Sequence, residues 1–125
     1  MKRLAFAVGL AAIIATSASA QTNVVILTGS TSGVYYPLGN TISSIFIKSI
    51  PGARSSVQVT KGSVENLNLL EAGDGELGFS LGDAVTAAWI GNSEAGFRAP
   101  LGKLRPFANC RRQFRSVCLR YQRKR

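Results

Sequence analysis

The sequence predicts an α/β domain built around a parallel sheet, and three observations support this prediction. A continuous apolar run, NVVILT at residues 23–28, is typical of a strand that is buried on both faces of a parallel sheet. A second strand begins about 30 residues after the first, which is the length of a βαβ unit. Helical and strand-like segments then alternate as far as residue 105, and such an order predicts an α/β fold.

The first βαβ unit ends near residue 60. Pro37 opens its helix, since proline is well suited to the first turn, and Pro51-Gly52 ends it. Five apolar residues of this helix are predicted to share one face: Leu38, Ile42, Ile45, Phe46 and Ile50. The sequence SSVQVT at residues 55–60 is a short strand in which Val57 and Val59 share a face.

A second helix is predicted from about Val64 to Ala72, with Gly73 just beyond its end. The segment ELGFSL, residues 76–81, follows as a third strand that completes the second unit.

A short apolar helix, AVTAAWI at residues 84–90, comes next and is stopped by Gly91. Trp89 in this helix is expected to be a core residue. Residues 92–103 are predicted to form a glycine-bearing and charged loop, and Leu104 begins a fourth strand.

The loop TGSTSGVYYP, residues 28–37, is the strongest candidate for a binding site. In an open parallel sheet, ligands bind beyond the carboxyl ends of the strands. Gly29 and Gly33 let the backbone approach a ligand closely, and the unpaired N–H groups of the following helix attract anions. The side chains that add hydroxyl or aromatic contacts are Thr28, Ser30, Thr31, Ser32, Tyr35 and Tyr36. Glycine and serine are also ordinary turn residues, so a purely structural role stays open.

Several kinds of catalysis are excluded by composition. The chain has no histidine, so it has neither Ser–His nor Cys–His catalysis and no histidine-ligated zinc. The loop lacks the lysine of a phosphate-binding P-loop and the glycine spacing of a dinucleotide site. Thr31 stands where a nucleophile elbow requires serine. The sequence therefore predicts a binding protein and not an enzyme, with no catalytic residue, no cofactor and no metal.

Residues 1–20 have the features of a signal peptide. Lys2 and Arg3 precede an apolar run at residues 4–15, and Ala18-Ser19-Ala20 is a cleavage signal after Ala20. A membrane-spanning helix needs about 20 apolar residues, which makes a retained anchor the weaker interpretation. An exported, periplasmic protein is expected.

The net charge of +9 is concentrated at the C-terminal end. Residues 21–105 hold six basic and six acidic residues, whereas residues 106–125 hold seven basic residues and no acidic one. Both cysteines, Cys110 and Cys118, also lie in this basic tail, but a lone pair is weak evidence for a disulfide. Three hypotheses account for the tail: binding to anionic lipid or nucleic acid, a solvated extension, or a reading-frame slip near codon 105. The last is favoured, because alanine- and valine-rich coding in GC-rich DNA gives arginine and cysteine out of frame.

Three stretches in order, TGSTSGVYYPLGN, KGSVENLNLLEAGDGELGFSLGDAVTAAWIGNSEAGF and LGKLR, resemble the TAXI family. Its members are the extracytoplasmic solute-binding subunits of TRAP transporters, also described as immunogenic proteins. The resemblance covers residues 24–105. It implies a type II periplasmic-binding-protein-like fold of two α/β lobes, which captures a small organic anion such as glutamate for a membrane permease driven by an ion gradient. Because family members are much longer, it also implies that residues 21–105 are part of an N-terminal lobe.

The resemblance implies a binding site of three segments. These are the loop from Gly29 to Gly33 with its two tyrosines, the start of the second helix, and the turn from Ser80 to Asp83. The ligand-binding residues it implies are Gly29, Ser30, Thr31, Ser32, Gly33, Tyr35, Tyr36, Ser63 and Asp83. Many relatives have Gln-Ser-Asp where this chain has Leu81-Gly82-Asp83, so polar contacts at positions 81 and 82 differ. For Ser63 and Asp83, helix capping is the alternative role.

A second function from another class also fits the sequence. In that alternative, the chain is a small secreted cationic protein whose arginine-rich tail binds anionic membrane or nucleic acid. The main prediction involves no nucleic acid.

Overall fold

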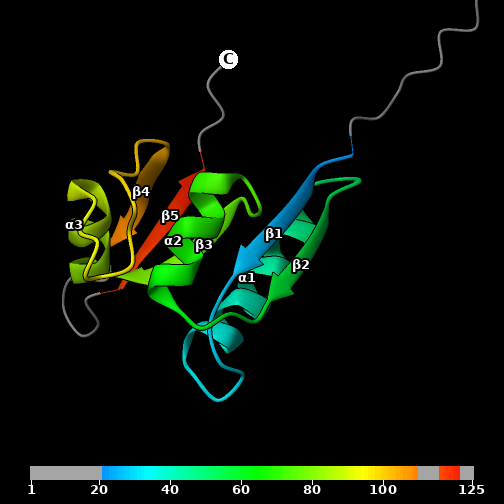
Figure 1. Cartoon of the computed structure of the whole chain (residues 1–125). Coiled ribbons are helices and arrows are strands. Elements are labelled where there is room, and N and C mark those ends of the chain that lie inside the picture. Colours follow the sequence, from blue (N-terminus) through cyan, green and yellow to red (C-terminus); the bar gives the residue numbers. More distant parts are fainter. Residues whose placement is uncertain (1–20, 110–115, 122–125) are drawn as a thin grey trace, which may run out of the picture.

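The computed structural model describes residues 21–109 and 116–121. The predicted signal peptide (residues 1–20), its cleavage site and Cys110 lie outside the described residues. Eight elements follow one another along the chain (Figure 1): β1 (Asn23–Leu27), α1 (Tyr35–Ser49), β2 (Arg54–Gln58), α2 (Ser63–Ala72), β3 (Leu77–Leu81), α3 (Gly82–Ile90), β4 (Leu104–Asn109) and β5 (Ser116–Tyr121).

The strands form one sheet in the order β2-β1-β3-β5-β4. β1 pairs in parallel with β2, from Asn23 opposite Arg54 onward, and with β3, where Ile26 lies opposite Leu77. The predicted α/β class with a parallel sheet is therefore confirmed. β5 is antiparallel to both of its neighbours and separates β3 from β4. The arrangement is compatible with an incomplete periplasmic-binding-protein-like lobe.

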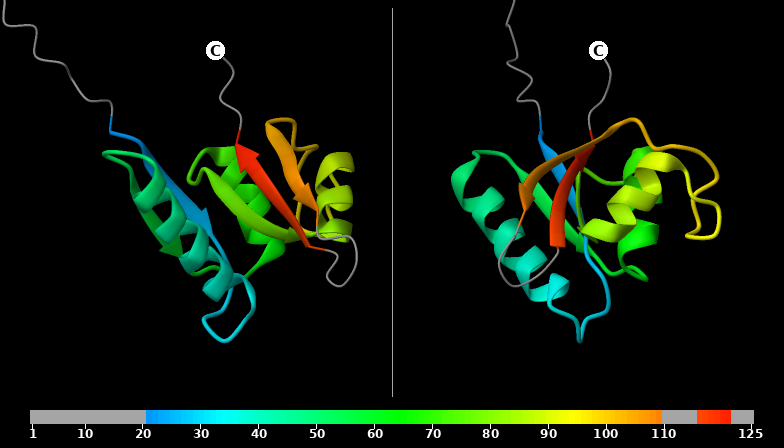
Figure 2. Two further views of the ribbon diagram at one scale, coloured as in Figure 1. Left: turned by 180° about the vertical axis from the view of Figure 1, so that it is seen from behind. Right: turned by 90° about the vertical axis from the view of Figure 1, so that its left-hand side faces the viewer.

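Helices cover both faces of the sheet, α1 on one side and α2 with α3 on the other (Figure 2). Two hydrophobic clusters result. The cluster under α1 contains Val24, Ile26, Leu77 and Phe79, against which Tyr35, Ile42 and Phe46 pack. The cluster under α2 and α3 contains Leu27, Leu67, Leu70, Ala88, Phe97, Leu101 and Leu104. β3 is buried along Leu77–Ser80, as expected for a strand covered on both faces.

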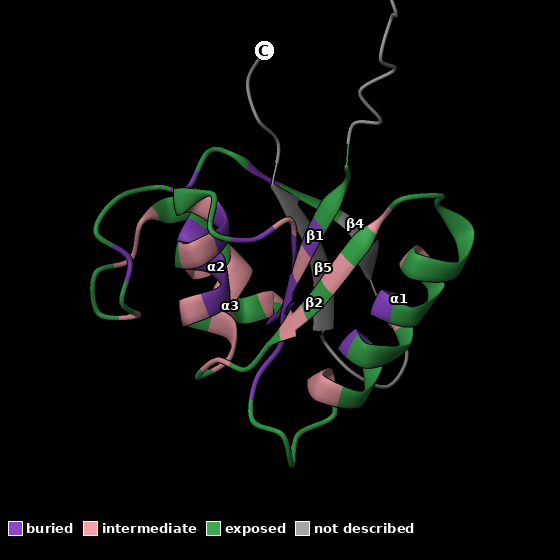
Figure 3. Ribbon diagram, turned by 90° about the vertical axis from the view of Figure 1, so that its right-hand side faces the viewer, coloured by how far each residue is buried: buried purple, intermediate pink, exposed green. Residues whose placement is uncertain are grey.

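The face that α1 turns to the sheet differs from the predicted one. Ile42 and Phe46 pack on the core, but Leu38 and Ile45 are 50% and 57% exposed, and the buried residues of the helix are Gly39 and Ser43. A Cβ added at Gly39 would lie 2.5 Å from Thr28 Cγ2. The helix thus approaches the sheet through its small residues, and much of its apolar surface faces outward (Figure 3).

The ends of α2 and α3 confirm two predictions and correct two. Gly73 and Gly91 end the helices in the left-handed conformation, as predicted. Ser63 and Asp83 are not the N-cap residues, because these positions are held by Gly62 and Leu81.

The prediction that Trp89 is a core residue is wrong. Its side chain is 60% exposed, whereas Phe97, in the segment predicted as a loop, is fully buried. Local bonds within this segment, among them Phe97 N–H to Asn92 O at 3.1 Å, turn Phe97 back onto α2 and α3.

No helix of the described residues has both the length and the apolar character that crossing a bilayer requires.

Candidate functional site

The candidate site lies at the carboxyl edge of the three parallel strands. β1 leads through α1 to β2 on one side, and the chain then crosses β1 through α2 to β3 on the other side. The space between the ends of β1 and β3 is therefore a topological switch point, where open α/β sheets bind their ligands. The loops that leave these strands are the ones from which the sequence predicted a site.

The amide of Asn66 joins β1 to β3 at this point. Its Nδ2 donates to Thr28 O at 2.6 Å and to Phe79 O at 2.7 Å, and its Oδ1 accepts from Thr60 Oγ1 at 2.6 Å. The residue is fully buried, so both amide protons and the amide oxygen are hydrogen-bonded where water cannot substitute.

Two threonines extend this network to β2. Thr28 donates to Gln58 O through its N–H at 3.0 Å and through its hydroxyl at 2.8 Å. Thr60 Oγ1 accepts the Gly62 N–H at 3.0 Å, while it donates toward Asn66. The ends of β1, β2 and β3 are thereby fixed relative to one another.

The tip of the first loop, Ser30 to Ser32, extends beyond the sheet into solvent. The Ser30 and Ser32 hydroxyls lie 2.9 Å apart and form a hydrogen bond, and the Gly33 N–H donates to Ser30 O at 2.9 Å. Thr31 is exposed between them. These bonds shape the tip as a turn. The sequence analysis kept this purely structural role for glycine and serine as an alternative to ligand binding.

The base of the same loop contacts the start of α2. Gly29 is buried, and a Cβ built on it would lie 3.9 Å from Gly62 Cα and 3.7 Å from the Tyr35 ring. The Tyr35 ring stacks on Phe79, with ring centroids 5.2 Å apart. Tyr36 is half-buried in the first turn of α1.

Ser63 connects the start of α2 to the start of α3. Its Oγ accepts the Leu81 N–H at 3.0 Å, which explains why the hydroxyl does not cap its own helix. Asp83, two residues after Leu81, accepts the Ala84 N–H on Oδ1 at 2.7 Å and so satisfies a first-turn amide from within α3.

The structure brings together Gly29, Ser63 and Asp83 with their loops and leaves Ser30, Thr31 and Ser32 on a projecting tip. Asn66 and Thr60 were not among the predicted site residues. A signal for Asn66 was present in the sequence, because it shares a helical face with Leu67 and Leu70, where an apolar residue is expected.

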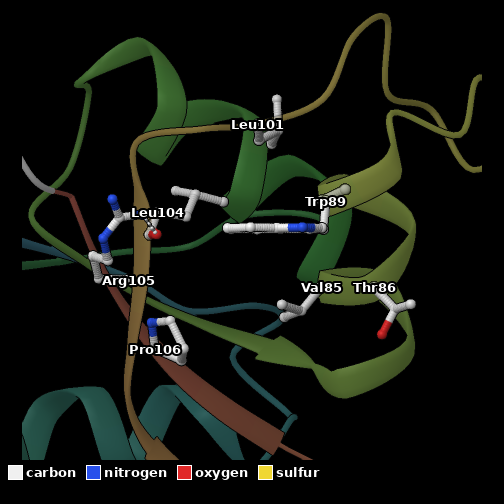
Figure 4. Close-up of a pocket in the computed structure, with 8 residues that line it drawn as sticks. Val85, Thr86, Trp89, Leu101, Leu104, Arg105 and Pro106 are labelled. Carbon is white, nitrogen blue, oxygen red and sulfur yellow. Dashed lines mark hydrogen bonds between the residues drawn. The ribbon is translucent and has the colours of Figure 1, made fainter.

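Two surface hollows are formed by the described residues. The larger, of about 480 Å³, lies between α3 and β4, where the Trp89 ring extends toward Leu104 (Figure 4). The smaller, of about 440 Å³, lies along α2 beside Lys61 and Asn68. Neither is lined by any of the predicted ligand-binding residues.

The comparison with known protein families agrees with this architecture. The model of the NMT1-like family, which is periplasmic-binding-protein-like, matches residues 26–120. The match begins within β1 and ends within β5, so it includes the candidate site and all the helices. The chain therefore belongs to the NMT1-like family.

Proposed function

We propose that this chain is a solute-binding component of a TRAP-type transporter, of the TAXI kind, that captures a small carboxylate such as glutamate in the periplasm. Membership of the NMT1-like family supports a solute-binding role. The TGSTSGVYYP and KGSVENLNLL stretches support the narrower assignment. Delivery of a solute to an ion-driven permease makes and breaks no covalent bond, so the proposed function is binding and not catalysis.

The observation that carries this proposal is the meeting of two helix starts at the switch point. Neither α1 nor α2 has a side chain that caps its first turn. The first-turn N–H groups of a helix carry partial positive charge and bind carboxylates readily. Ser63 adds a hydroxyl whose oxygen already accepts the Leu81 N–H, so it contacts a ligand as a donor. Carboxylate oxygens are the matching acceptors.

Calorimetric titration of the full chain with L-glutamate tests the proposal, with L-glutamine as the comparison of nearly equal size. Glutamate is expected to bind more tightly, because the edge offers donors to a second carboxylate. Absence of binding by glutamate and by other small carboxylates would contradict the proposal. Binding to anionic vesicles without any carboxylate binding would favour the alternative function predicted for the basic tail.

Replacement of Ser63 by alanine is expected to weaken glutamate binding about tenfold, the effect of losing one hydrogen bond to a charged group. Ser44→Ala is the matched control, because the Ser44 hydroxyl bonds only Asn40 O, at 2.9 Å, on the exposed side of α1. Both variants are titrated after circular dichroism has shown equal folded fractions. Equal affinities of the two variants for glutamate would show that the Ser63 hydroxyl does not contribute to binding.

A further inference from the structure

β2 is the last strand at one end of the sheet, and within the described part of the chain no strand pairs with its outer edge (Figure 1). The Arg54 N–H donates to Thr22 O at 2.8 Å, so the main-chain groups of Arg54 point toward β1. Successive residues of a paired strand direct their N–H and C=O groups to opposite sides. The main-chain groups of Ser55 and Val57 therefore point outward, where they can pair with a further strand.

The opposite end of the sheet is less suited to such pairing. β4 contains Pro106, which has no N–H to donate, and its register shifts between Pro106 and Ala108. Prolines and bulges are devices that keep other chains from pairing with an edge strand. β2 contains no proline and keeps a regular register with β1 along its whole length. Val59, just beyond β2, adds an apolar side chain that is 49% exposed.

The charges around β2 indicate what kind of strand this edge accepts. Residues 21–64, which include β1, α1 and β2, contain three basic residues and no acidic one. Lys48 lies in the last turn of α1, Arg54 at the start of β2 and Lys61 after its end, and all three are exposed. Glu65 lies close to Lys61, because its Oε2 accepts the Lys61 N–H. The uncompensated positive charge is therefore greatest at the Arg54 end.

These features argue against three other occupants of the edge. A second copy of this chain, paired antiparallel about Val57, would place Arg54 of each copy beside Lys61 of the other, and like charges that face each other destabilise a strand pair. Anionic lipid and nucleic acid would interact with the basic side chains but leave the outward main-chain groups of β2 unpaired.

We propose that the outer edge of β2 is a docking site for an extended, acidic segment of another protein, which adds a strand to the sheet and places a carboxylate beside Arg54. Main-chain hydrogen bonds to Ser55 and Val57 supply affinity in this mode of recognition, and the flanking side chains supply selectivity. The inference is independent of the proposed function, since the edge contains none of the predicted ligand-binding residues.

The test uses a fluorescently labelled peptide of about eight residues in which glutamate and valine alternate, long enough to span β2. Its binding to the full chain is measured by fluorescence anisotropy. The control peptide has the same sequence with N-methyl groups on alternate residues, so it keeps every charge but cannot donate main-chain hydrogen bonds along one side. The first peptide is expected to bind at least about tenfold more tightly than the control. Backbone amide signals of Ser55 and Val57, followed by NMR, locate the contact.

Two variants of the protein test the two parts of the site. Arg54→Gln is expected to weaken binding of the first peptide about two- to fivefold, the effect of one exposed ion pair. Arg98→Gln is the matched control, because it makes the same change at an exposed position in the segment after α3 and should leave the affinity unchanged. Val57→Pro removes an outward N–H and is expected to weaken binding at least about tenfold. Circular dichroism shows whether this variant folds, and if it does not, the N-methylated peptide tests the same hydrogen bonds.

Four outcomes would overturn the inference. They are absence of peptide binding, equal affinity of the two peptides, amide shifts confined to residues outside β2, and equal losses in Arg54→Gln and Arg98→Gln. Displacement of the peptide from β2 by anionic vesicles or by DNA at lower concentration than by unlabelled peptide would assign the basic residues to those polyanions. A dimer in sedimentation experiments that Val57→Pro abolishes would show that a second copy occupies the edge.

Discussion

Replacing Gly91 by alanine is expected to lower the free energy of unfolding by about 3 to 5 kcal/mol, the sum of backbone strain and overpacking. Gly91 ends α3 with φ near 70°, a conformation that L side chains rarely adopt. The added Cβ would also lie 2.5 Å from the nitrogen of Pro100 and 2.7 Å from the carbonyl carbon of Ala99. These atoms belong to backbone and cannot rotate away. Small domains are stable by only about 5 to 15 kcal/mol, so much of the stability is lost.

Two control variants divide this effect into its parts. Gly73 ends α2 in the same left-handed conformation, with φ 93° and ψ 18°, so Gly73→Ala measures the strain of alanine at such a helix end. Gly102→Ala has neither problem, because its Cβ position is open and its φ is not positive. Urea unfolding followed by circular dichroism gives the three values. If Gly91→Ala is no more destabilising than Gly73→Ala, the backbone at Ala99 and Pro100 accommodates the added Cβ without cost and the packing argument is wrong.

The second large effect is expected at Phe97, where alanine should cost about 3 to 5 kcal/mol. Phe97 is the largest fully buried side chain among the described residues and belongs to the cluster under α2 and α3. Removing its ring leaves a cavity that the surrounding helices and strand cannot close. Trp89→Ala removes a larger side chain from α3 but one that is 60% exposed, and it is expected to cost under about 1 kcal/mol.

Thermal and urea unfolding of both variants measure this contrast. A larger loss of stability in Trp89→Ala than in Phe97→Ala would show that the core under α2 and α3 is centred elsewhere. It would also restore the sequence-based prediction that the tryptophan is the core residue.

The order of elements could be predicted because it depends on local signals. The continuous apolar run of β1 and the glycines after α2 and α3 each indicate an element within a few residues of sequence. Where a prediction was wrong, the deciding contact came from outside the element that was predicted. Trp89 was expected in the core on hydrophobicity alone, but Phe97, eight residues later, occupies the space under α3.

The face of α1 could not be predicted from hydrophobicity for a related reason. Hydrophobic periodicity groups Leu38 and Ile45 with Ile42 and Phe46, although only Ile42 and Phe46 pack on the core. The structure selects the side on which Gly39 and Ser43 permit a close approach to Thr28 and β2. The smallest residues of the helix determine which side packs closely on the sheet, and a pattern of large apolar residues does not include them.

The candidate site shows the same division. Loop chemistry directed the site prediction to the carboxyl edge of the parallel strands, since glycines and hydroxyls after a buried strand are visible in the sequence. The role of Ser63 could not be seen, because its partner is the Leu81 N–H, 18 residues away. Nor does composition distinguish buried Asn66 from exposed Asn68; only their positions on opposite sides of α2 do.

The position of β5 between β3 and β4 has a consequence for how the chain folds. Leu81 pairs with Ser116, so one side of β3 stays unpaired while α3, the following segment and β4 are being synthesised. The N-terminal βαβ units form from contacts that are close in sequence. The sheet is completed only when β5, far along the chain, pairs with β3 and β4. During that interval a strand at the centre of the finished sheet is an edge open to other chains. Refolding from denaturant should accordingly give more soluble protein at low chain concentration, where the intramolecular partner β5 reaches β3 before a neighbouring molecule does.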